Sequence, residues 1–263
     1  MRKFAILTLF LLLLTACRKT DETALIFDSV TADESVKLSN DEASPSCNVH
    51  IQMHYATDEN GDRAQIVNNI IEKRLLNMSD LPFAHAVDSF ASHYTQSYQK
   101  NLLPMYNQDR ADESKRKWYE YHYIIDTETV VGRRNTTVYT ANIDYYEGGA
   151  HSISQCVILN FVNKSGHLLD LEDIFMPGYE QSLNDRLREA LCEKVNVRNV
   201  RELHNKGYLF SMDIFPATNF IINDETITFV YNPYEIASYD KGSTELTLAL
   251  ADLRTILRPE FIP

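Results

Sequence analysis

The chain has 263 residues, with 25 Lys and Arg against 37 Asp and Glu, which gives a formal net charge of −12 at pH 7. A protein this acidic repels nucleic acid, so nucleic-acid binding is excluded, and it attracts cationic partners at long range. Solubility alone also accounts for such a charge.

The amino terminus has the pattern of an export signal. Met1-Arg2-Lys3 is a short basic region, and the apolar run from Phe4 to Leu14 is broken only by Thr8. The run is shorter than the about 20 residues that a membrane-spanning helix needs, and it has the length of a signal-peptide core. It ends in Leu14-Thr15-Ala16-Cys17, which resembles a bacterial lipobox.

We therefore expect a lipoprotein signal peptide over residues 1–16 and fatty acids such as palmitate on Cys17. Two or three acyl chains hold a protein on a membrane, because each buried CH2 contributes about 0.8 kcal/mol. The expected location is the cell envelope, on the outer membrane, facing the periplasm or the cell surface. A plain signal peptide with an incidental cysteine, or an uncleaved anchor, is the alternative. Loss of Arg2 and Lys3 with the signal takes the net charge from −12 to −14.

Residues 17–46 are rich in Asp, Glu, Ser and Thr, and no apolar period persists in them. We expect this segment to be the lipidated cysteine followed by a flexible acidic tether, which reaches on the order of 30 Å. The folded part is then expected to begin near Cys47.

Strand and helix patterns follow one another from Cys47 onward. Apolar residues at helical spacing predict helices over residues 63–77, 82–104 and 179–195. Alternating or continuous apolar runs predict strands over residues 48–55, 118–125, 136–146, 153–162 and 244–250, and a hairpin over residues 220–231. Because hairpin turns outnumber long crossovers, we predict an α+β fold of mainly antiparallel sheet with helices packed on one face.

Three cysteines remain beyond the lipobox, namely Cys47, Cys156 and Cys192. The odd number permits at most one disulfide within the chain, and no pair has the Cys-x-x-Cys spacing of metal or redox sites. We therefore expect no metal site, no cofactor and no catalytic thiol.

The carboxy-terminal motifs occur in a distinctive order. A tyrosine-rich strand leads into Gly148-Gly149-Ala150-His151, and a strand and a turn then precede Leu169-Asp170-Leu171-Glu172-Asp173-Ile174-Phe175. The run from Phe229 to Gly242 includes Asn232-Pro233-Tyr234-Glu235. This order resembles the RsiV-type extracellular domain, the DUF3298 family. Residues 47–144 resemble its companion module, DUF4163, which also occurs in a peptidoglycan deacetylase, and residues 145–263 would form the RsiV-like module packed with it as one unit.

The resemblance implies a binding module. Namesake members are membrane-bound anti-sigma factors whose outer domain binds lysozyme, and in the deacetylase relatives a separate domain performs the chemistry. We expect neither that domain nor a cytoplasmic anti-sigma segment in this chain. A lysozyme-like protein or peptidoglycan is therefore the expected ligand, and the acidity suits a cationic lysozyme.

Five aromatic residues are the candidate ligand contacts: Tyr145, Tyr146, His151, Tyr234 and Tyr239. Tyrosine gives a broad contact area with only two rotatable angles and often contributes binding hot spots. The alternative is that these residues serve the fold, as aromatic cross-strand pairs and as part of a required turn.

Two other classes of function stay open. Glu147 and His151 flank the glycine turn, and Asp170 and Asp173 follow it, so an acid–base enzyme acting on cell-wall carbohydrate is one alternative. The sequence has neither His-Glu-x-x-His nor Gly-x-Ser-x-Gly, so we assign no catalytic residue. A lipoprotein that binds another envelope protein during assembly is the third class, and the oligomeric state is left open.

Overall fold

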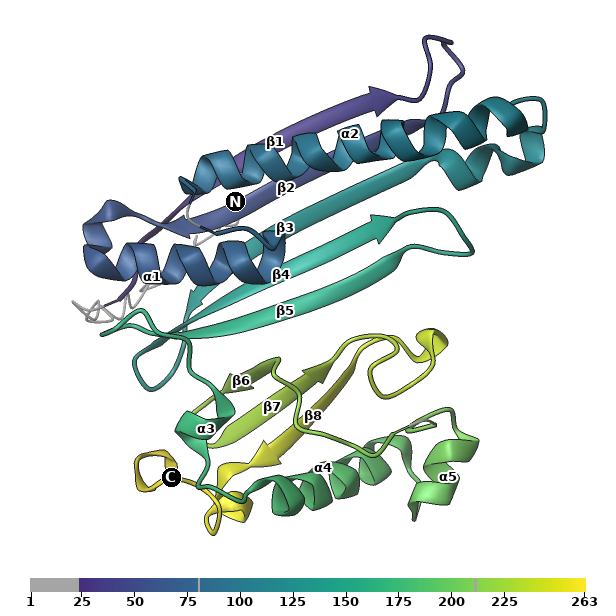
Figure 1. Cartoon of the computed structure of the whole chain (residues 1–263). Coiled ribbons are helices and arrows are strands. Elements are labelled where there is room, and N and C mark those ends of the chain that lie inside the picture. The colour runs from purple at the N-terminus through teal and green to yellow at the C-terminus, as the bar shows by residue number, and fades with distance from the viewer. Residues whose placement is uncertain (1–23, 80, 211) are drawn as a thin grey trace, which may run out of the picture.

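The computed structural model describes residues 24–79, 81–210 and 212–263 (Figure 1). The predicted signal peptide and Cys17 lie outside the described residues. Two sheets lie one beside the other, each with helices on one face. The prediction of an α+β fold with mainly antiparallel sheets is confirmed.

The larger sheet has five strands in the order β1-β2-β3-β4-β5. Only the β2–β3 pair is parallel, since a helical crossover connects these two strands while turns connect the others. The strands are β1 (Phe27–Lys37), β2 (Ser46–Ala56), β3 (Tyr121–Val131), β4 (Thr136–Tyr146) and β5 (Ile153–Val162).

The crossover consists of α1 (Asp62–Ile71), a π-helical stretch (Glu72–Leu76), α2 (Phe83–Asp109) and a 3-10 stretch (Glu113–Tyr119). Figure 1 shows α1 and α2 covering the same face of the sheet. Alternate residues of β2 are buried against them, among them Ile51 and Met53, because side chains of a strand point to opposite faces in turn. The strand predicted over residues 118–125 begins later, at Tyr121.

The smaller sheet consists of β6 (Phe220–Ile222), β7 (Thr226–Tyr231) and β8 (Thr244–Ala249), all antiparallel. The first two strands form the predicted hairpin. Leu183, Leu187 and Leu191 follow one stripe of α4 (Glu180–Val195) and are fully buried in a second core against this sheet. The chain also forms α3 (Leu171–Ile174) and α5 (Val200–Asn205), neither of which was predicted.

The flexible tether expected over residues 17–46 requires correction within its described part, residues 24–46. Residues 27–37 form β1, which pairs with β2 along its whole length. Its alternate residues Val30, Ala32 and Val36 pack into the helix-covered core. Glu34 shares that face and accepts hydrogen bonds from Ser92 and Thr95 of α2. The strand was not predicted because the many acidic residues between its apolar side chains made the alternating pattern difficult to recognise.

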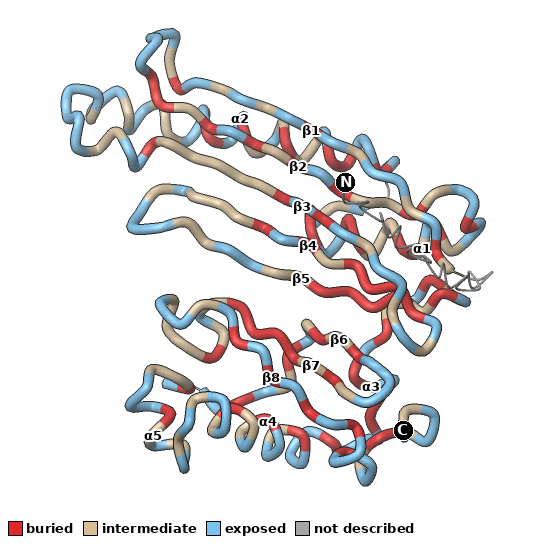
Figure 2. Tube along the Cα trace, turned by 180° about the vertical axis from the view of Figure 1, so that it is seen from behind, coloured by how far each residue is buried: buried red, intermediate tan, exposed pale blue. Residues whose placement is uncertain are grey.

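The expected boundary between residues 144 and 145 also requires correction, because it falls inside β4. The first core extends to Phe161 and the second begins at Leu169, so the change from one half to the other comes after β5. Figure 2 shows buried residues concentrated separately in the two halves.

The two halves are joined along the edge strand β5 by side-chain amides. Asn232 accepts a hydrogen bond from the Cys156 amide through Oδ1 (2.7 Å) and donates through Nδ2 to the Cys156 carbonyl (3.0 Å). Asn219 donates to the same carbonyl (2.9 Å) and accepts from the Ile158 amide (3.1 Å). These amides satisfy backbone groups that a sixth strand would otherwise pair.

No helix within the described residues is long and apolar enough to cross a membrane. Cys47, Cys156 and Cys192 are free thiols, and burial raises the pKa of Cys47 to about 12.

The asparagine junction gives a stability prediction. Asn232→Ala leaves the partly buried Cys156 amide without its acceptor, so we expect the free energy of unfolding to fall by about 1–2 kcal/mol. Asn223→Ala, in the exposed hairpin turn, should change it by less than about 0.5 kcal/mol. Urea denaturation of both variants measures the difference. Equal stabilities would show that the junction contributes nothing.

Candidate functional site

The loop from Glu147 to Ser152, between β4 and β5, depends on glycine. Gly148 and Gly149 have φ angles of 81° and 109°, a region that other residues rarely adopt. A Cβ atom on Gly148 would lie 2.9 Å from the carbonyl oxygen of Trp118, so the loop also approaches this backbone closely. The two glycines therefore fix where Glu147 and His151 lie.

Three of the five predicted ligand contacts form one aromatic stack on the surface. The rings of His151 and Tyr239 lie 3.7 Å apart between centroids and only 10° from parallel. Tyr234 adds a third ring, 5.4 Å from Tyr239 and 6.4 Å from His151. His151 and Tyr234 are exposed, and Tyr239 is half-buried beneath them.

The stack joins the two halves of the molecule. Tyr239 comes from the second half and donates its hydroxyl hydrogen to the Ser152 carbonyl in the β4–β5 loop (2.7 Å). The Nδ1 atom of His151 lies 2.9 Å from the same carbonyl, which assigns the proton to Nδ1 because a carbonyl can only accept. Nε2 lies 3.4 Å from the Tyr234 hydroxyl.

Tyr234 has an unusual backbone for an exposed side chain. Its φ angle is 73°, and 59% of the residue is exposed. A bulky residue in this region is strained by about 1–2 kcal/mol relative to glycine. Such strain concentrates at functional positions, where the side chain is needed in a fixed orientation.

Tyr145 and Tyr146 do not join the stack. Tyr145 lies on the helix-covered face, where its ring stacks on Tyr123 at 5.6 Å. Tyr146 lies on the opposite face, where its ring stacks on His122 at 6.2 Å and its hydroxyl donates to the Gly149 carbonyl. The structure therefore does not bring these two side chains together, because adjacent residues of β4 point to opposite faces.

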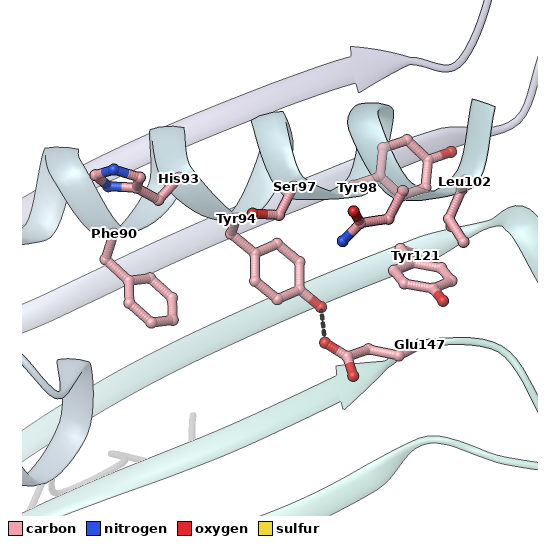
Figure 3. Close-up of a pocket in the computed structure, with 9 residues that line it drawn as sticks. Phe90, His93, Tyr94, Ser97, Tyr98, Leu102, Tyr121 and Glu147 are labelled. Atoms are coloured by element: carbon pink, nitrogen blue, oxygen red, sulfur yellow. Dashed lines mark hydrogen bonds between the residues drawn. The ribbon is translucent and has the colours of Figure 1, made fainter. Parts of the chain in front are cut away.

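A separate pocket lies between α2 and the end of β4 (Figure 3). Its volume is about 430 Å³, and aromatic side chains form its walls. Tyr94 donates a hydrogen bond to Oε1 of Glu147 (2.8 Å), the residue that follows β4. The helical spacing of Phe90, Tyr94 and Tyr98 predicts an inward face of α2. No pattern in the sequence indicates that a glutamate 53 residues beyond Tyr94 reaches the same pocket.

The four candidate acid–base residues have different surroundings. Glu147 accepts from Tyr94, and His151 lies in the stack. Asp170 and Asp173 form the capping box of α3, with Asp173 accepting from the Asp170 amide at 3.0 Å. Burial and the neighbouring Asp173 raise the pKa of Asp170. Across the described ranges, no group of three or more His, Cys, Asp and Glu is placed to hold a metal ion.

Comparisons with known proteins agree on one family. A family model described as "Protein of unknown function (DUF3298)" matches residues 172–251. A crystal structure of a DUF3298 family member from Bacteroides fragilis has 31% sequence identity and a TM-score of 0.80, over 90% of this chain and 95% of that one. A DUF3298 family protein from Pseudomonas aeruginosa has the same fold at 15% identity, with a TM-score of 0.62 over 92% of this chain and 99% of that one. No curated protein matches the chain.

The glycine loop gives a second prediction. Gly148→Ala and Gly149→Ala each add a Cβ atom to a residue with positive φ. Only the Cβ added at residue 148 would clash with the Trp118 backbone. We expect Gly148→Ala to be less stable than Gly149→Ala by about 1–3 kcal/mol, from the added clash. Trp118 is the only tryptophan, so its fluorescence should shift in Gly148→Ala alone. Equal stability and unchanged fluorescence would contradict the close approach.

Proposed function

This chain belongs to the DUF3298 family, and we propose that it is a lipid-anchored binding module that works outside the cytoplasm. The observation that carries the proposal is the exposed stack of His151, Tyr234 and Tyr239. Hydrogen bonds hold it in place before any ligand arrives, so little conformational entropy is lost on binding.

The strained backbone of Tyr234 supports the same function. At a φ of 73°, glycine at position 234 would make the fold more stable than tyrosine does, because glycine adopts positive φ without strain. An exposed tyrosine kept there is consistent with selection for contact with a partner.

The proposed ligand is a lysozyme-like protein, or peptidoglycan. The resemblance to the RsiV type suggests the class, and the net charge of −12 favours association with a cationic protein through long-range attraction. The lipobox at Cys17 would hold the module in the envelope, where such ligands occur. We propose binding without catalysis, since the candidate acid–base residues have the separate surroundings described above.

Two substitutions at Tyr234 distinguish the contribution of its side chain to binding from the effect of its backbone conformation on stability. Tyr234→Gly and Tyr234→Ala both remove the ring, so we expect each to lower the affinity for lysozyme by roughly 30-fold, as for a hot-spot residue. Tyr234→Gly should be more stable than Tyr234→Ala by about 1 kcal/mol, because glycine tolerates the positive φ. Isothermal titration with lysozyme and urea denaturation measure the two effects.

Met105→Ala, an exposed apolar side chain on α2, is the control and should bind as the parent does. Full affinity in both Tyr234 variants would exclude the stack as the contact surface. If lysozyme binds none of these proteins, capture of an envelope protein by the parent but not by Tyr234→Ala would support the assembly role at the same stack.

A further inference from the structure

The pocket beneath α2 is a second site with its own chemistry, independent of the stack. Figure 3 shows Phe90 and Tyr94 reaching down from the helix, with Tyr121 of β3 below it and Glu147 facing the Tyr94 hydroxyl, and Tyr98 also lines the pocket. The volume of about 430 Å³ is in the range of small-molecule sites.

Contacts between rings hold the aromatic walls in place. Tyr94 and Tyr123 have centroids 4.9 Å apart, and Tyr98 and Tyr121 have centroids 5.2 Å apart. The hydroxyl of Tyr98 donates to the carbonyl of Tyr119 (2.8 Å), which fixes this buried ring from the other end. The pocket is therefore largely preformed, and a ligand meets ring faces without reordering them.

Glu147 supplies the charge of the pocket. The described lining includes no Lys or Arg, and its one histidine, His93, has Nδ1 2.8 Å from the Ser89 carbonyl. Glu147 is exposed and is the one carboxylate among these residues. Only Oε1 receives a hydrogen bond from the described part of the chain, and Oε2 is left for a ligand. Burial and the hydrogen bond to Glu147 raise the pKa of Tyr94, so its phenol stays neutral and remains a donor.

We propose that this pocket binds a small ligand through an ammonium group, held between the aromatic ring faces and the Glu147 carboxylate. Ring faces carry negative electrostatic potential and attract a cation within about 6 Å of the centroid. The carboxylate adds a direct charge pair and distinguishes a cation from an uncharged apolar group of the same shape. Quaternary and primary ammonium groups share this chemistry.

Choline and its neutral isostere 3,3-dimethylbutan-1-ol test the proposal on the full chain by isothermal titration. We expect choline to bind about tenfold more tightly than the isostere, because only choline uses the carboxylate and the ring quadrupoles. Glu147→Gln removes the charge pair and keeps the ring faces, so the preference for choline should fall to about threefold. Glu193→Gln makes the same charge change on the exposed surface of α4 and should leave the preference intact.

Equal affinities for choline and the isostere in the parent, or no binding of choline, would overturn the proposal. So would an undiminished preference in Glu147→Gln. Tyr94→Phe keeps the ring and frees Oε1, so choline affinity should stay the same or rise by a few fold. A tenfold loss of choline affinity in Tyr94→Phe would contradict the proposal. It would show that the Tyr94 hydroxyl, and not the ring faces and the carboxylate, makes the main contact with the ligand.

Discussion

Every edge strand has outward backbone groups that need partners, and for β5 two asparagines supply them. The amides of Asn219 and Asn232 bond the backbone of Cys156 and Ile158 in the pattern of a neighbouring strand. The second half is thereby attached at one register along the first sheet. Val138, Ile158 and Val230 form a small apolar cluster at the same junction and add burial of apolar surface to these hydrogen bonds.

The candidate site depends on this attachment because its rings come from both halves. His151 lies in a loop of the first sheet, while Tyr234 and Tyr239 follow β7 only a few residues beyond Asn232. Fixing Asn232 against Cys156 therefore limits where the two tyrosines can lie. The β4–β5 loop also turns Glu147 toward α2, so the same two glycines separate the stack from the aromatic pocket.

Much of the fold can be predicted from the sequence where the apolar period is long and uninterrupted. The strands at residues 136–146 and 153–162 have the predicted bounds, since their alternation is clear. The strand at residues 27–37 was missed because acidic and hydroxyl residues separate its short apolar side chains. For the site, proximity in sequence was a poor guide. Tyr145 and Tyr146 are adjacent yet point to opposite faces, whereas His151 meets Tyr234 across the junction.

The central claim is that the asparagine junction holds the aromatic stack together. Proton NMR of the His151 imidazole, compared between the full chain and its Asn232→Ala variant, tests this claim. A ring 3.7 Å away and nearly parallel shields these protons strongly, so they should resonate well upfield of free histidine in the parent. In Asn232→Ala they should move toward the free position while circular dichroism shows the secondary structure retained. Unchanged shielding in the variant would contradict the account, because the stack would then form without the junction.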